Sequence, residues 1–353
     1  MQSTRIKMMS IPGKLFLAVF VLALISPSAH GAPQGSGYKL IRKIPIGGEG
    51  RWDYLSFDPV ARRLYVSHLA HIVVIDADAG KVVGDIDTGD PQFTHRAVVA
   101  REFGRIFTSN AGTSTVGIFD LKTLAKLGEV KTDVGTDAII YDPASKRVFT
   151  FNGRSKNSTA IDPATGNIVG TIALSGRPEF PEIDGAGHLY VNIADKSEIS
   201  AIDPKALTVT QTWPVAPCVE PSGLAMDVAH HRLFAGCRNK LMVMINADTG
   251  EVLGSVPIGP GVDADRFDPG TGYAFASTVD GMLTIAHEDS PDKMTLVDNV
   301  KTQIGARTME VDPKTHHVFV ITADLGPATP EAPDNPRAWP ILPNTFVVLE
   351  YGK

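Results

Sequence analysis

The feature that most constrains this chain is a repeat of about 42 residues that occupies most of its length. Each copy contains an aromatic residue followed by small or β-branched residues, and the seven aromatics are Tyr65, Phe107, Phe149, Tyr190, Phe234, Phe275 and Phe319. An aspartate, often followed by proline, precedes six of them, at Asp58, Asp142, Asp184, Asp227, Asp268 and Asp312, and Ala100 takes its place in the second copy. We call this position of the repeat the anchor. A fixed period of this length is typical of proteins built from repeated structural units.

Within each copy, the pattern of apolar residues predicts strands. Leu55 and Phe57 alternate with polar neighbours, and residues 72–75 form a β-branched run. Segments rich in turn-forming residues, such as 76–81 and 162–167, separate these runs. Each copy is therefore expected to form four short antiparallel strands. Seven such units predict an all-β fold, a seven-bladed β-propeller.

The two ends of the repeat region predict how the ring closes. Residues 38–46 resemble a fourth strand with no partners before it, and residues 345–351 resemble a third strand with no fourth after it. Pairing both in one blade completes the seventh sheet and leaves no open edge. We therefore predict one propeller domain over 38–351, closed by the N-terminal strand in the last blade. A parallel β-solenoid is the alternative, but its rungs are usually shorter than this repeat.

The aromatic segments of the repeat resemble a known family. Segments such as Tyr65–His68 and Tyr190–Ile193 are similar to the four-residue signature of YVTN-repeat seven-bladed propellers, although no copy spells it in full. That family includes the YncE-like periplasmic proteins. The resemblance covers nearly all of 38–351. It implies the propeller fold and no particular reaction.

The first 31 residues predict a secretory signal peptide. Three basic residues precede a short apolar run at 15–25, and small residues follow at 26–32. A bilayer span needs about 20 apolar residues, so a signal that is cleaved after Gly31 is favoured over a membrane anchor. We expect a periplasmic or secreted protein with no membrane span after cleavage.

Export bears directly on the two cysteines of the chain. An oxidising compartment favours a disulfide over a metal or catalytic site, so Cys218 and Cys237 are expected to pair. The bond would close a loop of about 20 residues, between the start of the innermost strand of blade five and the end of its second strand.

The repeat register predicts a ring of polar side chains at one mouth of the central channel. In a blade, the loop that enters the innermost strand and the loop that leaves the second strand lie at the same mouth. Five residues before the anchor, six of seven positions are ionisable: Asp53, His95, Asp137, Glu179, Asp263 and Arg307, with Ser222 as the seventh. The neighbouring positions are mostly apolar or small, such as Leu55, Val98, Ile139, Leu224 and Met309.

Two interpretations of this ring stay open: it binds a ligand, or it only lines a water-filled channel. Carboxylates in such a ring repel each other unless a cation offsets them. The metal candidates are Asp53, His95, Asp137, Glu179 and Asp263. Calcium accepts oxygen ligands of this kind, and Arg307 could hold an anionic group. No cofactor or catalytic residue is assigned from the sequence.

Three functions are consistent with these features. The first is an exported propeller that binds a small ligand, a metal ion or a protein partner at the channel mouth. The second is a metal-assisted hydrolase, lactonase or lyase acting at the same ring. The third is an interaction protein that uses the outer blade edges. The net charge of −6 and the absence of basic blocks argue against nucleic acid as a partner. We expect a monomer.

Two further features lie outside the ring. The pairs His230-His231 and His316-His317 stand in the hairpin after the innermost strand, where the first copy has Arg62-Arg63, so we interpret them as turn and strand residues. Residues 325–344 contain six prolines and separate the second and third strands of the last copy. A segment of this length is either a lid over the mouth or an irregular excursion.

Overall fold

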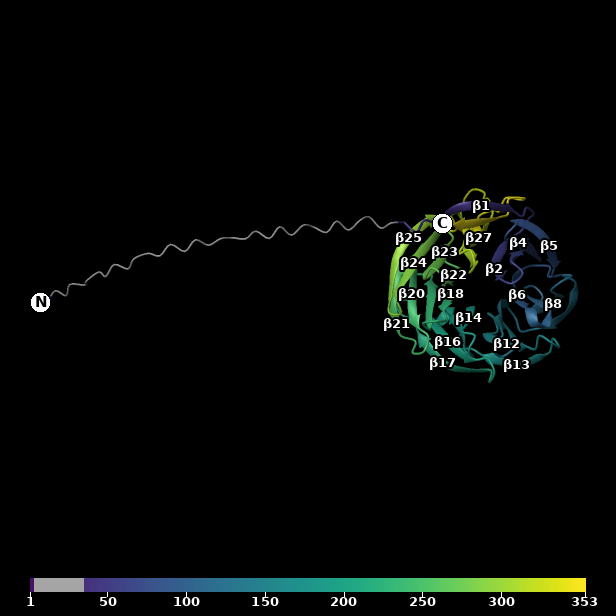
Figure 1. Ribbon diagram of the computed structural model, residues 1–353, viewed down its shortest axis with the longest axis horizontal. Coiled ribbons are helices and arrows are strands. Elements are labelled where there is room, and N and C mark those ends of the chain that lie inside the picture. The colour runs from purple at the N-terminus through teal and green to yellow at the C-terminus, as the bar shows by residue number, and fades with distance from the viewer. Residues whose placement is uncertain (3–34) are drawn as a thin grey trace. The chain divides into compact units, whose positions relative to one another are not determined.

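The computed structural model describes residues 1–2 and 35–353. The predicted signal peptide lies almost entirely outside the described residues, so it stays a prediction. Within residues 35–353, seven four-stranded antiparallel sheets form a ring, which confirms the predicted propeller (Figure 1). Among the described residues, none of the helices has the length and apolar character needed to cross a bilayer.

All seven blades have the same strand order from the channel to the rim. The innermost strands are β2 (Trp52–Asp58), β6 (Thr94–Ala100), β10 (Thr136–Asp142), β14 (Pro178–Ile183), β18 (Pro221–Asp227), β22 (Ala264–Asp268) and β26 (Thr308–Val311). The second strands are β3 (Arg63–His68), β7 (Arg105–Asn110), β11 (Arg147–Asn152), β15 (Leu189–Ile193), β19 (Arg232–Cys237), β23 (Tyr273–Thr278) and β27 (Val318–Thr322).

The outer half of each blade follows the same order. The third strands are β4 (His71–Asp76), β8 (Thr115–Asp120), β12 (Asn157–Ile161), β16 (Glu198–Asp203), β20 (Leu241–Asn246), β24 (Met282–Ser290) and β28 (Val347–Gly352). The rim strands are β5 (Lys81–Asp87), β9 (Lys126–Lys131), β13 (Ile168–Ala173), β17 (Thr208–Pro214), β21 (Val252–Pro257), β25 (Lys293–Lys301) and β1 (Lys39–Pro45). Short 3₁₀ turns occur at Arg101–Phe103, Ala194–Lys196 and Pro336–Ala338.

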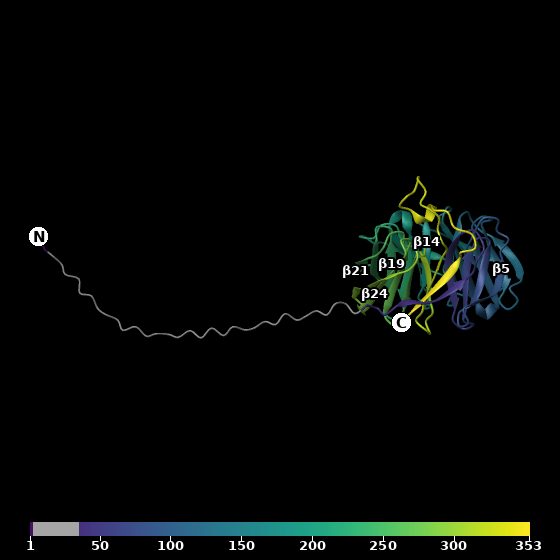
Figure 2. The same ribbon diagram turned by 90° about the horizontal axis from the view of Figure 1, so that it is seen from above.

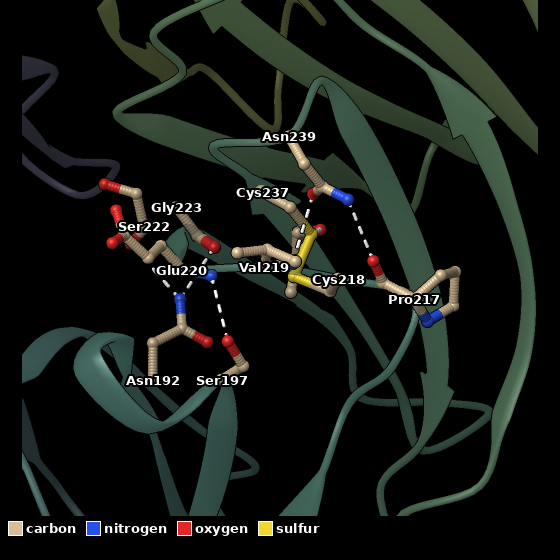
Figure 3. The surroundings of a disulfide bond; sticks show 11 residues. Asn192, Ser197, Pro217, Cys218, Val219, Glu220, Ser222, Gly223, Cys237 and Asn239 are labelled. Atoms are coloured by element: carbon tan, nitrogen blue, oxygen red, sulfur yellow. Dashed lines mark hydrogen bonds between the residues drawn. A yellow bond between two sulfur atoms is a disulfide. The ribbon is translucent and has the colours of Figure 1, made fainter.

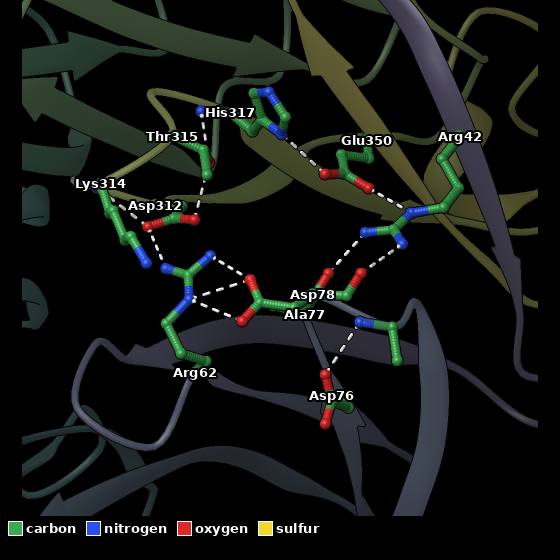
Figure 4. Close-up of polar contacts among 11 residues, drawn as sticks. Arg42, Arg62, Asp76, Ala77, Asp78, Asp312, Lys314, Thr315, His317 and Glu350 are labelled. Atoms are coloured by element: carbon green, nitrogen blue, oxygen red, sulfur yellow. Dashed lines mark hydrogen bonds and ion pairs between the residues drawn. The ribbon is translucent and has the colours of Figure 1, made fainter.

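The ring closes as predicted. β1 pairs antiparallel with β28, in a sheet with the order β1-β28-β27-β26. Arg42 of β1 donates to Glu350 of β28 at 2.5 Å, and also to the backbone carbonyls of Ala77 and Asp78 in blade one (Figure 4). The strand that closes the last blade thus also binds the first blade.

A second arginine strengthens the same junction from blade one. Arg62 donates to the carboxylate of Asp312 in blade seven at 2.6 Å and to Asp78 in its own blade at 2.6 Å (Figure 4). Burial raises the pKa of Asp312, but hydrogen bonds from Arg62 and Thr315 outweigh it and hold that pKa below its ordinary value. The carboxylate therefore stays ionised and paired where the ring closes.

The apolar core lies within and between neighbouring blades. The aromatic residue of every repeat copy is buried: Tyr65, Phe107, Phe149, Tyr190, Phe234, Phe275 and Phe319. Full burial of one such side chain contributes about 1.5–3 kcal/mol. The residue type that makes the repeat recognisable in the sequence is therefore also a main source of its stability.

The anchor aspartates cap the hairpin that follows each innermost strand. Asp58 accepts hydrogen bonds from the backbone amides of Val60 and Ala61, at 3.0 and 3.2 Å. The same kind of amide capping occurs at Asp142, Asp184, Asp227, Asp268 and Asp312. A short carboxylate satisfies turn amides that would otherwise lack partners, which explains why aspartate recurs at this position.

The predicted disulfide between Cys218 and Cys237 is present, with the two Cα atoms 5.4 Å apart (Figure 3). Cys237 ends β19, and Cys218 lies in the loop that leads into β18. Asn239 supports this loop, because its side chain donates to the Pro217 carbonyl at 2.9 Å and accepts from the Val219 amide at 3.1 Å. The bond holds the loop against the end of the second strand.

Replacing both cysteines with alanine should lower the free energy of unfolding by about 3 kcal/mol, because the unfolded chain loses a cross-link around a short loop. Chaotrope-induced unfolding would measure the difference. A reducing agent should destabilise the parent protein by a similar amount and leave the double variant unaffected. Equal stability of parent and variant under oxidising conditions would contradict this expectation.

Candidate functional site at the channel mouth

The ring residues lie at or near the starts of the innermost strands. In five blades the pairing of this strand shifts register near its start, for example between Trp52 and Leu55 in β2 and between Thr94 and Arg96 in β6. A bulge of this kind breaks the strict alternation of side chains. It allows two consecutive residues to face the channel, as Asp53 and the next residue do in blade one.

His95 lies between two aspartates. Its Nδ1 atom is hydrogen-bonded to Asp53 and is 3.2 Å from a carboxylate oxygen of Asp137. Burial lowers the pKa of His95, but the charges of Asp137 and Asp53 outweigh it and raise that pKa to about 9. Burial also raises the pKa of Asp137 to about 6, against the opposing charge of His95. At neutral pH the imidazole of His95 is therefore protonated on both nitrogens, and its positive charge lies between the two carboxylates.

Asp263 faces two arginines on the opposite part of the ring. Arg307 donates to one of its oxygens at 2.9 Å, and Arg337 lies 3.1 Å from the other. Ser222 also donates to Asp263, at 3.3 Å. Burial raises the pKa of Asp263, but Arg337 and Arg307 hold it below the ordinary value. This aspartate is an ionised partner of the arginines, so it is a poor candidate for a metal ligand.

Each carboxylate of the ring has a basic side chain as its partner. Glu179 pairs with Arg177 in the same segment of the chain, rather than with another ring residue. Arg177 and Arg337 are cations that the aligned column does not contain. Asp53 and Asp137 have His95 as their only ion-pair partner among the described residues.

The proline-rich loop 325–344 reaches this mouth, as its position in the repeat predicts. Arg337 contacts Asp263 and donates to the Gly261 carbonyl at 3.3 Å. Figure 2 shows the loop, in yellow, standing above one face of the ring. A cavity of about 80 Å³ lies between the loop and the ring, lined by Trp52, Arg307 and Arg337 among others. The loop therefore covers part of the mouth, and its opening as a lid stays a prediction.

Below the ring, aromatic side chains fill the channel. Tyr54 of blade one and Phe180 of blade four meet edge to face, with ring centroids 5.0 Å apart. Arg96 and Arg266 stack on Phe180, at 4.7 and 4.6 Å from its centroid. These residues come from different blades, so their contacts cross the channel below the ring.

A buried ionic layer follows the aromatic layer. Arg266 donates to both oxygens of Glu310, at 2.7 and 3.1 Å, and lies 3.9 Å from Glu182. A cavity of about 510 Å³ opens at this end of the channel, between these charges and hairpin residues such as Pro59 and Pro313.

These two layers were not predicted from the sequence. The positions beside the ring were expected to be mostly apolar or small, which is wrong for Arg96, Glu182, Arg266 and Glu310, and the large aromatic side chains of Tyr54 and Phe180 were not singled out. These residues stand four or two places before the anchor. Comparing those two columns separately would have revealed the ionisable residues within otherwise apolar strands.

The fold and the mouth together define the class of this protein: a seven-bladed β-propeller with a polar channel mouth. Neither a scan against protein-family models nor a sequence search of curated proteins finds a match. A similar solved structure is a chain described as "Crystal Structure of Mitotic Checkpoint Complex", with a TM-score of 0.70 and 15% identity. The match covers 87% of this chain and 96% of that one. At this identity, the likeness shows the fold alone.

Proposed function

We propose that this protein is an exported binding propeller whose channel mouth holds a divalent transition-metal ion. The observation that carries the proposal is the cluster of Asp53, His95 and Asp137, which offers one ligand atom from each residue within 4.8 Å of the others. Two carboxylates and one imidazole leave coordination positions for water or a ligand. The imidazole favours ions such as Zn²⁺ or Ni²⁺ over the calcium considered from the sequence.

Protonation supports the same assignment. The proton on His95 compensates two aspartates that have no arginine partner, and a divalent ion could replace it. Metal ligands must be deprotonated, so binding should tighten as the pH rises towards the pKa of His95. The arginines held on Asp263 face the same mouth and could bind an anionic group of a ligand beside the ion.

The location and the family belong to the proposal as well. The N-terminal sequence pattern supports export to the periplasm or the cell exterior, and the disulfide is typical of an oxidising compartment. The repeat supports membership of the YVTN propellers. Binding of a small molecule or a protein partner at the mouth is consistent with the fold.

A metal-assisted hydrolase at the same site is the second candidate. An ion held by Asp53, His95 and Asp137 with open coordination positions favours it, because such an ion activates bound water as a nucleophile. Assays of metal-loaded protein against lactones and esters would decide between binding and catalysis.

Metal-stripped protein should bind Zn²⁺ at the mouth and become more stable. An ion that binds only the folded state adds about 2.7 kcal/mol at a hundredfold excess over its dissociation constant. Asp137→Asn should bind one equivalent fewer and lose the corresponding rise in melting temperature. Asp85→Asn is the matched control, because Asp85 forms an exposed pair with His71 at 2.7 Å, and no third ligand lies beside them within the described part of the chain.

Titration calorimetry and thermal unfolding would test this with Zn²⁺, Ni²⁺, Mn²⁺ and Ca²⁺. The proposal fails if none of these ions binds at the mouth, or if Asp137→Asn binds as many equivalents as the parent protein. The mouth would then be an ion-pair network that lines the channel.

A further inference from the structure

A second group of ligand-type side chains lies at the junction of blades five and six, on the side away from the mouth. Asp227 ends β18, His230 lies in the hairpin before β19, and Glu288 lies in β24. One ligand atom from each of the three lies within 4.8 Å of the others. The Nδ1 atom of His230 is 2.5 Å from Asp227 and 3.3 Å from Glu288.

The repeat register correctly predicted that His230 lies in this hairpin, but it could not predict that Glu288 lies beside it. Strands β24 and β25 have nine residues each, whereas every other described strand has seven or fewer. This extension carries Glu288 past the hairpin of its own blade, where its amide donates to the Gly272 carbonyl at 2.9 Å. The side chain thereby reaches the hairpin of blade five.

Glu288 is buried, and the only ion pair of its carboxylate among the described residues is the 3.3 Å contact with His230. The side chain of Glu288 is only 3% exposed, and neither carboxylate oxygen makes a hydrogen bond with a described residue. A buried carboxylate in this position destabilises the fold unless a proton or a cation compensates it.

The equivalent place at three other blade junctions holds a basic side chain. The anchor aspartate meets a basic side chain from the next blade in the pairs Asp58–Arg101, Asp268–His316 and Asp312–Arg62. At Asp227 the next blade supplies the carboxylate of Glu288 instead. The nearby Arg232 does not replace the missing cation, because it donates to the Pro291 carbonyl and to Asp292.

We propose that Asp227, His230 and Glu288 form a divalent-metal site that joins blades five and six, with Zn²⁺ or a similar transition-metal ion as its occupant. Nitrogen and carboxylate ligands at about 2.0–2.2 Å from such an ion lie about 3.3 Å apart in a tetrahedral centre. The measured separations of 2.5 and 3.3 Å need only a small outward movement of His230, whose side chain is 52% exposed. Water can complete the coordination from the same side.

Zn²⁺ titration of metal-stripped full-length protein tests this site separately from the mouth. Glu288→Gln should bind one equivalent fewer than the parent protein, or bind it at least tenfold more weakly, and His230→Gln should behave the same. Asp137→Asn, which alters only the mouth, should retain this site. His316→Gln is the matched control, because His316 faces the anchor Asp268 at 2.9 Å with no second carboxylate within ligand distance among the described residues.

Co²⁺ provides a second measurement in an Asp137→Asn background, which removes the mouth site. There, coordination by His230 gives an absorption spectrum that Glu288→Gln and His230→Gln should lose and His316→Gln should keep. Glu288→Gln removes a like-charge contact, so the metal-free variant should be at least as stable as the parent. If Glu288→Gln does not fold, the His230→Gln variant, whose substitution lies at an exposed position, tests the metal site by itself. Zn²⁺ binding in these variants with unchanged stoichiometry and affinity overturns the proposal, whether or not the mouth binds metal.

Discussion

Replacing Arg266 with methionine should lower the free energy of unfolding by about 3–5 kcal/mol, the cost of leaving a buried ion pair without one partner. The side chain of Arg266 is 8% exposed and that of Glu310 is 11% exposed. Burial already raises the pKa of Glu182 to about 7, and Arg266 opposes that shift most strongly. Without the guanidinium, Glu182 and Glu310 would share Arg96 alone, which lies 3.9 Å from Glu310, so one of the two carboxylates would have to lose its charge or take up water.

Chaotrope-induced unfolding at pH 7 measures this cost. The double variant Arg266→Met/Glu310→Met should recover much of the loss, because it removes the uncompensated charge together with its partner. Arg51→Met is the control, since Arg51 is an exposed arginine at the mouth. A loss below about 1 kcal/mol for Arg266→Met would show that the channel charges are solvated rather than buried.

The fold was predictable because two local requirements recur at a constant period. Every hairpin after an innermost strand needs a cap, which aspartate supplies in six copies, and every second strand buries an aromatic residue such as Phe107 or Phe234. Both signals can be recognised without long-range information. The closure by β1 followed from counting strands, because an unpaired strand at each end of the chain leaves one consistent partner.

The candidate site was predictable only in part. The repeat register identified Asp53, His95 and Asp137 as neighbours around the mouth, and the structure brings them together. It did not identify Arg177, which stands two places before the ring column in the loop that enters β14, or Arg337, which comes from the loop 325–344 outside the repeat. Charge balance at the mouth depends on those loops, so the net charge of the aligned column was misleading.

The aromatic and ionic layers of the channel and the cluster around Glu288 could not be predicted, for related reasons. Bulges at the strand starts make consecutive residues face the channel, so simple alternation assigns Tyr54 and Arg96 to the wrong side. Glu288 reaches blade five only because the β24–β25 hairpin is longer than its equivalents. Both groups depend on local departures from the repeat. A comparison of aligned repeat copies does not reveal such departures.

Asp265 should make the stability of this protein fall as the pH rises from about 4 to 8. It lies in β22, is 0% exposed, and neither of its carboxylate oxygens has a hydrogen-bond partner among the described residues. It fits beside Gly223 and Gly236 of blade five, where a Cβ atom at Gly223 would stand 2.8 Å from the carboxylate. Burial raises its pKa from 3.8 to about 8, and the Gly236 amide and Arg266 oppose this only in part.

The direction follows from proton binding. The folded state keeps the proton of Asp265 up to about pH 8, whereas the unfolded chain loses it near pH 4, so its contribution is complete below pH 4 and declines above it. Four pKa units at about 1.4 kcal/mol each give an effect on the order of 5 kcal/mol. Asp265→Asn stays neutral, so it should match the parent protein at pH 4 and exceed its unfolding free energy by several kcal/mol at pH 8. Asp334→Asn, an exposed change in the blade-seven loop, should leave the parent's pH profile unaltered. Parallel stability profiles for Asp265→Asn and the parent protein would mean that Asp265 is ionised in the folded state and that solvent or a cation reaches it between blades five and six.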